Sequence, residues 1–132
     1  MLARFNLKTT KKEGFYPIDE AVRGAVAQSQ AQNGLAVVFC PHTTAGLTIN
    51  ENADPDVARD LMAGLNRAFP DDPAFAHREG NSQAHLKALA LGSSLSLVIE
   101  NGRLLLGVWQ GIFFGEFDGP RNRTFFVKVI SG

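Results

Sequence analysis

The densest group of chemically useful side chains is the stretch from His42 to Asp56, H-T-T-A-G-L-T-I-N-E-N-A-D-P-D. It combines an imidazole with hydroxyls, carboxamides and carboxylates, and it directly follows an apolar run. Polar groups cost free energy when they are buried without partners, so packing alone does not explain this density. The stretch therefore predicts a binding or catalytic site.

The chain has only three histidines, His42, His77 and His85. Three neutral imidazoles and a water form a standard catalytic zinc set, which makes these residues candidate metal ligands. Spacing alone leaves other roles open, namely helix capping, a hydrogen-bonded core position or a surface position. Glu51 is a candidate general base toward a metal-bound water, together with His42 as a catalytic residue. Alternatively, Glu51 accepts a hydrogen bond from a metal-binding imidazole and so fixes the orientation of its ring.

Seven further residues are candidates for substrate binding, and each also has a local structural explanation. The hydroxyls can bind phosphate or close a turn, and the carboxamides can bind substrate or satisfy a turn or a helix cap. The two arginines flank a turn, where they can grip phosphate through paired donors or face solvent. These residues are Thr43, Thr44, Asn50, Asn81, Gln110, Arg121 and Arg123.

Three runs together resemble the YjbQ-like family, small proteins often labelled secondary thiamine-phosphate synthases. They are H-T-T-A-G-L-T-I-N-E-N-A-D-P-D-V, F-A-H-R-E-G-N-S-Q-A-H-L-K-A-L-A-L-G and G-R-L-L-L-G-V-W-Q-G-I-F-F-G-E-F-D-G-P-R-N-R. The resemblance covers nearly the whole chain, and the three histidines match those of the family. It implies a homotrimer and an activity that joins phosphorylated pyrimidine and thiazole precursors. Many relatives carry tyrosine where this chain has Phe75, so a phenolic hydroxyl cannot act there.

The reaction and the residues suggest different ions. A diphosphate substrate would bring in magnesium, which prefers oxygen ligands, whereas three histidines favour zinc or another divalent transition metal. We therefore expect a metal- or phosphate-binding enzyme that acts on a small phosphorylated metabolite. The alternative is a trimer that binds a metal or metabolite without turning it over. A purely structural oligomer leaves the polar stretch unexplained.

Bulk composition excludes several classes of protein. The chain has 132 residues, which fits one domain over residues 1–132, and 45% of them are hydrophobic, enough for a core. A formal net charge of +0 argues against a nucleic-acid partner. A single cysteine, Cys40, rules out an intrachain disulfide and favours a reducing compartment. No apolar run approaches the roughly 20 residues of a membrane span, so we expect a cytoplasmic protein without a membrane partner.

Hydrophobic periodicity predicts an α+β domain of largely antiparallel sheets with about three helices. Helices are expected from Pro17 to about Ser29, from Asp54 to before Pro70, and from Asn81 or Ser82 to Leu91. Alternation or apolar runs predict the strands, at residues 3–8, 35–40, 46–50, 95–99, 104–110, 112–117 and 124–130.

Aromatic residues in the last strands suggest an interface. These strands carry Phe113, Phe114, Phe117, Phe125 and Phe126, more aromatic surface than one sheet face needs. We expect the excess to be buried against neighbouring subunits. A trimer places strand ends and loops of neighbours together, so the polar site is expected between subunits.

Overall fold

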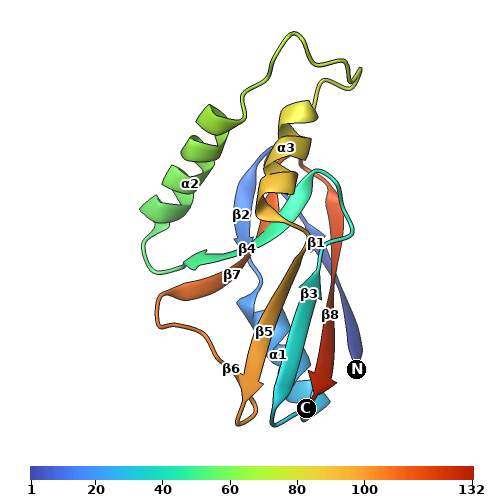
Figure 1. Ribbon diagram of the computed structural model, residues 1–132, viewed down its shortest axis with the longest axis vertical. Coiled ribbons are helices and arrows are strands. Elements are labelled where there is room, and N and C mark those ends of the chain that lie inside the picture. Colours follow the sequence, from blue (N-terminus) through green and yellow to red (C-terminus); the bar gives the residue numbers. More distant parts are fainter.

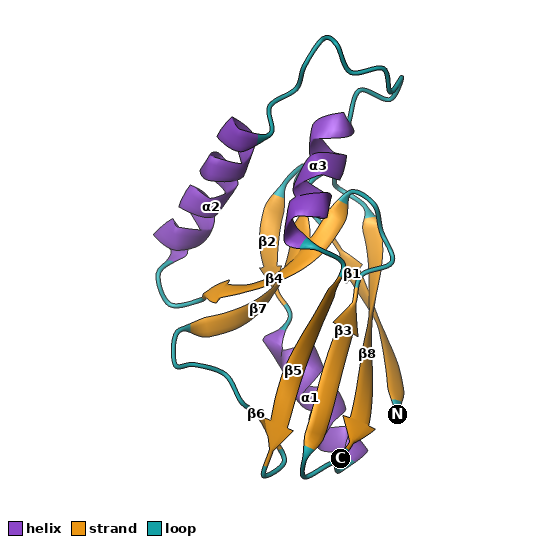
Figure 2. Ribbon diagram, in the orientation of Figure 1, coloured by secondary structure: helices purple, strands orange, loops and turns teal.

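The computed structural model describes residues 1–132. A five-stranded antiparallel sheet has the order β1-β8-β3-β5-β6 and forms the lower half of the molecule in Figures 1 and 2. Its strands are β1 (Leu2–Lys8), β3 (Gly34–Phe39), β5 (Ser94–Glu100), β6 (Arg103–Leu104) and β8 (Asn122–Ser131). Neighbouring strands are joined antiparallel throughout, as the hairpin-rich C-terminal half predicted.

A second, three-stranded sheet has the order β2-β7-β4. Its strands are β2 (Gly14–Pro17), β4 (Ala45–Glu51) and β7 (Gln110–Glu116). The three helices are α1 (Asp19–Ser29), α2 (Pro55–Ala68) and α3 (Ser82–Leu91). In Figure 1, α2 and α3 stand at the end of the molecule opposite the chain termini.

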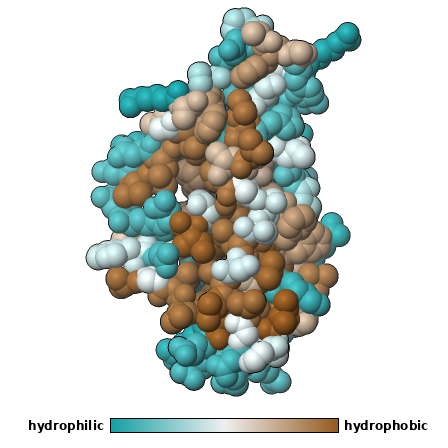
Figure 3. All heavy atoms as spheres, in the orientation of Figure 1, coloured by the Kyte–Doolittle hydropathy of each residue, from teal (hydrophilic) through white to brown (hydrophobic).

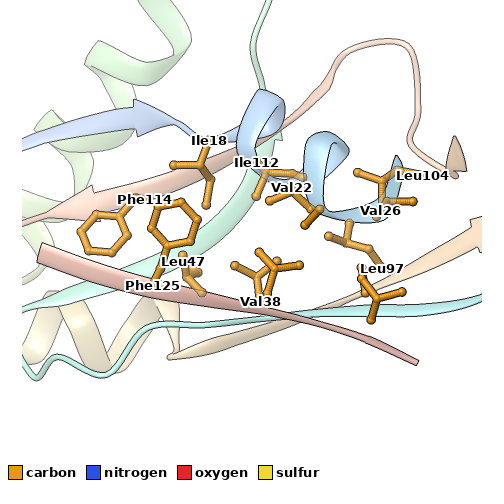
Figure 4. Close-up of a cluster of buried hydrophobic side chains, with 14 of the residues drawn as sticks. Ile18, Val22, Val26, Val38, Leu47, Leu97, Leu104, Ile112, Phe114 and Phe125 are labelled. Atoms are coloured by element: carbon orange, nitrogen blue, oxygen red, sulfur yellow. The ribbon is translucent and has the colours of Figure 1, made fainter. Parts of the chain in front are cut away.

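The core fills the space between the large sheet on one side and α1 with the small sheet on the other. Figure 4 shows Val22 and Val26 of α1 facing Val38 and Leu97 of the large sheet, and Phe114 of β7 beside Phe125 of β8. Alternate residues of β3, β5 and β8 point into this core, which is the period-two pattern of a half-buried sheet. The outer face of the large sheet has no element of the chain against it, and Leu35, Phe39, Val98 and Ile130 remain 42–48% exposed there.

Two facing glycines allow α3 to approach the small sheet. Gly46 of β4 pairs in register with Gly115 of β7. A Cβ added at Gly46 would lie 2.9 Å from the Gly92 carbonyl oxygen, and one at Gly115 would lie 2.9 Å from Leu91 Cδ2. The C-terminal end of α3 therefore packs directly on the backbone of these strands. This packing fixes the direction in which the polar residues of α3 point.

The helix predictions are confirmed for α2 and α3. Asp54 caps α2 by accepting a hydrogen bond from the Asp56 amide at 2.9 Å, and Pro55 is its first residue. Gly92 ends α3 in a left-handed conformation with φ +94°. The first helix begins two residues later than predicted, because Pro17 is the last residue of β2 rather than part of the helix.

Two strand assignments were wrong. Strand β2 falls in a segment that was expected to lead into the first helix, and its four residues are too few to show a period. The strand expected at residues 104–110 is only β6, because residues 105–109 leave the sheet. Leu105, Val108 and Trp109 are 61%, 89% and 62% exposed, so their apolar character does not reflect burial within the chain.

The phenylalanine-rich strands also differ from expectation. Four of the five, Phe113, Phe114, Phe117 and Phe125, are buried within one subunit, so they do not form an interface; Phe126 is only partly buried and pairs in register with Phe39. The apolar surface left uncovered is the outer face of the large sheet and the loop around Trp109. No helix is long and apolar enough to cross a membrane.

Candidate functional site

A polar pocket of about 310 Å³ opens where the β3–β4 loop, the start of α3 and the β7–β8 turn meet. None of its lining residues except Pro41 is apolar in character, and most carry a charge, a hydroxyl or an amide. The lining consists of Pro41, His42, Thr43, Thr44, Glu79, Asn81, His85, Asp118, Arg121 and Arg123. Six of the predicted substrate-binding and catalytic residues therefore come together: His42, Thr43, Thr44, Asn81, Arg121 and Arg123.

The floor of this pocket is a buried ion pair between Arg123 of β8 and Glu116 of β7. Arg123 Nε donates to Glu116 Oε1 at 2.8 Å, and its Nη2 donates to Glu116 Oε2. Nη2 also donates to Thr44 Oγ1 at 2.9 Å. The two side chains are 5% and 0% exposed. Because one guanidinium edge is held by the carboxylate, the remaining nitrogen, Nη1, is free of hydrogen bonds within the chain.

The carboxylate of Glu116 is ionised, and each of its two oxygens accepts two hydrogen bonds. It accepts further hydrogen bonds from the Thr9 hydroxyl at 2.8 Å and the Asp118 amide at 3.1 Å. Burial opposes ionisation of this carboxyl, but the hydrogen bonds from Arg123 and Thr9 outweigh it and lower the pKa of Glu116. The charge of Arg123 is thus neutralised below the pocket, while the guanidinium is held rigidly at its edge.

A second carboxylate, Asp118, holds the pocket rim. Its Oδ2 accepts from Asn81 Nδ2 at 2.8 Å and from Arg121 Nη2 at 2.9 Å, and its carbonyl accepts from Arg121 Nε at 2.7 Å. Burial opposes ionisation, but these hydrogen bonds outweigh it and lower the pKa of Asp118. Asn81 therefore does not cap α3 with its side chain. Its Oδ1 is buried and accepts no hydrogen bond, which leaves an acceptor for a ligand or water donor.

His42 is a neutral imidazole that lines the pocket. Its Nε2 accepts from the Thr124 backbone N–H at 2.9 Å, which places the ring proton on Nδ1. Burial, and then the charge of Arg123, lower the pKa of this imidazole. The neutral tautomer is consistent with both effects.

These residues do not fit a three-histidine zinc site. The Nε2 lone pair of His42 is taken by the Thr124 amide, and its Nδ1 carries the proton, so neither nitrogen offers a lone pair to a metal. The rings of His77 and His85 lie edge to face with centroids 5.5 Å apart, but His77 does not line the pocket. No group of three or more His, Cys, Asp and Glu side chains in the structure is arranged to hold a metal ion.

The other predicted residues lie at the opposite end of the small sheet. Glu51 pairs in register with Gln110, and Asn50 with Gly111, whereas Ala45 at the other end of β4 pairs with Glu116. Seven residues of strand span roughly 20 Å, so β4 carries Glu51 away from His42. Asn50 Oδ1 accepts from the Glu51 amide at 2.8 Å, which is a local role. Within one subunit, Glu51 cannot serve His42 as a general base.

Sequence reasoning gave no role in the site to the carboxylates that organise the pocket, Glu116, Asp118 and Glu79. Glu116 carried a usable signal, because it interrupts the apolar run from Ile112 to Phe117. A buried glutamate requires a cationic partner, and Arg121 and Arg123 were the nearest choices that follow it along the chain. Phe75, which stands where many relatives have tyrosine, is 38% exposed and does not line the pocket.

The family model of the UPF0047 protein YjbQ-like group matches residues 3–132. The chain belongs to the UPF0047 (YjbQ-like) family. A UPF0047 protein of Methanocaldococcus jannaschii is 48% identical over 130 residues, covering 98% of this chain and 94% of that protein. The UPF0047 protein YugU of Bacillus subtilis is 45% identical and covers 98% of this chain and 99% of its own.

Solved structures of the UPF0047 family share the fold. The crystal structure of a YjbQ/UPF0047 protein from Clostridium acetobutylicum superposes with a TM-score of 0.95 at 55% identity, covering 97% of this chain and 99% of that chain. A YbjQ-like protein from Sulfolobus solfataricus gives the same TM-score at 27% identity, covering 100% and 97% of the two chains. The single-domain α+β architecture is thus common to these proteins.

Proposed function

We propose that this UPF0047 protein binds a small phosphorylated metabolite in the polar pocket. The observation that carries the proposal is the fixed guanidinium of Arg123, whose Nη1 is unpaired while its other edge is held by Glu116 and Thr44. His42, Thr43 and the exposed Arg121, each of which has a side-chain donor, line the same pocket. Fixed donors around one small volume are the arrangement that recognises a phosphate group.

The carboxylates of the pocket limit which anion is accepted. Asp118 is engaged by Asn81 and Arg121, and Glu116 lies beneath Arg123, so their charges are largely compensated. Glu79 accepts a long hydrogen bond from Asn81 Nδ2 at 3.4 Å and lies 3.9 Å from the exposed His77, and its negative charge disfavours a highly charged anion. A phosphate monoester with a hydrogen-bond donor for the unpaired Asn81 Oδ1 fits this set better than a bare diphosphate.

Isothermal titration with methyl phosphate tests the proposal. Arg121→Ala should weaken binding about tenfold, the loss typical of one partly solvated charged hydrogen bond. Arg59→Ala is the matched control, because Arg59 is an exposed arginine on α2, paired only with Asp56. Undetectable binding to the unmodified protein, or equal losses in both variants, contradicts the proposal.

Turnover of the bound metabolite is a second part of the proposal. The thiamine-phosphate synthase reaction implied by the family resemblance is its first candidate, and the donors proposed above for the phosphate would hold one phosphorylated precursor. An enzyme forms product from pyrimidine diphosphate and thiazole phosphate, and loses rate in His85→Ala. A binding protein takes up thiazole phosphate without forming product, in which case the non-catalytic alternative holds.

We also propose a metal site with two histidine ligands in place of three. The rings of His77 and His85 are near enough to bind one ion between them, whereas Nε2 of His42 is already occupied by the Thr124 amide. Equilibrium dialysis against zinc tests this. Stoichiometric zinc that is lost in His77→Ala and in His85→Ala, but retained in His42→Ala, supports it. Retention in all three variants contradicts it.

We also propose that the subunits assemble as a homotrimer. The support is the uncovered outer face of the large sheet, whose Leu35, Phe39, Val98 and Ile130 are 42–48% exposed. A trimer can bring Glu51 and Gln110 of one subunit toward the pocket of the next, which one subunit alone does not do. Sedimentation equilibrium should give three times the 14.3 kDa subunit mass, and Val98→Glu should reduce it to the monomer mass.

A further inference from the structure

The polar pocket continues into a second hollow with a different lining. This hollow has a volume of about 490 Å³ and shares His42, Thr43 and His85 with the polar pocket. Beyond these shared residues it is lined by Ala45, Ala88, Leu89, Gly92 and Ser93, none of which carries a charge. We call this hollow the apolar shelf.

The apolar shelf is built from small residues with one large exposed side chain at its edge. Leu89 follows His85 by one turn of α3 and is 79% exposed, whereas Ala88 and Ala45 are buried in the shelf floor. The close approach of α3 to Gly46 keeps this floor shallow and fixed. Figure 3 shows hydrophobic residues in brown over α3, in the upper half of the molecule.

The apolar shelf lies next to the polar pocket, and this position determines which ligands the two together can bind. The shared residues His42, Thr43 and His85 form the boundary between a charged pocket and an uncharged shelf. A ligand whose phosphate occupies the pocket must extend either into solvent or across these residues onto the shelf. Covering Leu89 and Ala88 removes apolar surface from water, so an apolar extension is favoured on the shelf.

We infer that the ligand is amphiphilic, with a phosphate head in the polar pocket and an apolar chain or ring across the shelf against Leu89. This inference rests on the proposed phosphate site and names the class of molecule that site takes. A sugar phosphate or an inorganic anion leaves the shelf unused. A phosphate ester of an aliphatic or aromatic alcohol uses both parts.

The test is an isothermal titration series with methyl, butyl and hexyl phosphate. A fully buried methylene tightens binding about fourfold, so partial cover by an open shelf should give about twofold per methylene. Hexyl phosphate should therefore bind at least about tenfold tighter than methyl phosphate. In Leu89→Gln this dependence on chain length should be lost, while methyl phosphate binds as it does to the unmodified protein.

The control is Leu2→Gln, which changes another exposed leucine, 62% exposed, in β1. It should keep the full dependence on chain length. Equal affinity for the three esters, or an unchanged dependence in Leu89→Gln, overturns the inference and leaves the phosphate site standing. A lower oligomer mass in Leu89→Gln assigns Leu89 to a subunit contact and also overturns it. Failure of methyl phosphate to bind the unmodified protein removes the phosphate site itself.

Discussion

Replacing Glu116 by glutamine should destabilise the fold strongly. Glu116 is 0% exposed and is the only carboxylate bonded to the buried Arg123, with further hydrogen bonds from Thr9 and Asp118. Glutamine has nearly the same shape as glutamate, but its NH₂ group is a donor and would face the donors that now bond to the carboxylate. The guanidinium of Arg123 would also lose its counter-charge. Leaving one buried charge uncompensated costs about 3–5 kcal/mol. Urea unfolding at pH 7 measures this loss.

Exposed Glu100→Gln on β5 is the control and should change the free energy of unfolding by less than about 0.5 kcal/mol. The double variant Glu116→Leu with Arg123→Met removes both charges and should recover most of the loss, because well-packed apolar residues can replace a buried pair. A loss below about 1 kcal/mol in Glu116→Gln would refute the reasoning, since the guanidinium would then be solvated in another way.

Three other predictions concern acid sensitivity, histidine titration and helix packing. Glu116 has a lowered pKa in the folded protein and its ordinary pKa of 4.5 in the unfolded chain. Its contribution to stability is therefore complete above about pH 4.5 and is lost as the pH falls through the folded-state pKa. The double variant Glu116→Leu with Arg123→Met should make the free energy of unfolding less dependent on pH in that range. His42 also has a lowered pKa in the folded protein, so below its ordinary pKa of 6.5 the unfolded chain binds more protons than the folded one. The free energy of unfolding therefore falls as the pH drops below about 6.5. In His42→Gln, urea unfolding between pH 7 and pH 5 should no longer show this contribution to the pH dependence. Gly46→Ala places a Cβ 2.9 Å from the Gly92 oxygen and should cost about 1–3 kcal/mol in urea unfolding, whereas Gly64→Ala, with open space on helix α2, should be neutral or stabilising.

Local patterns predicted most of the fold. The Asp54 cap of α2, the Gly92 end of α3, the buried run of β3 and the alternation of β8 each reflect a preference that a few neighbouring residues express. The segment from Leu105 to Trp109 could not be assigned in this way, because an apolar side chain exposed on a loop has the same sequence pattern as one buried in a strand.

The sequence predicted many of the residues of the candidate site, but it predicted their positions relative to one another only in part. His42, Thr43, Thr44, Asn81, Arg121 and Arg123 do meet, although they come from three separate segments. Glu51 seemed to belong with them because it follows in the same stretch, but β4 is extended and carries it to the far end of the small sheet. Proximity in sequence is poor evidence of proximity in space once a strand intervenes. The role of His42 depends on a hydrogen bond from Thr124, a residue 82 positions away, which no local pattern reveals.

The most direct test of the central claim is a methyl phosphate titration followed by amide chemical shifts in two-dimensional nitrogen–proton NMR spectra. The account predicts saturable shifts for the amides of His42, Thr43 and Thr44 and for those of Arg121 and Arg123. The amides of Glu51 and Gln110, at the other end of the small sheet, should shift much less or not at all. Shifts confined to that far end, or no saturable shifts at any concentration, would contradict a phosphate site in the polar pocket.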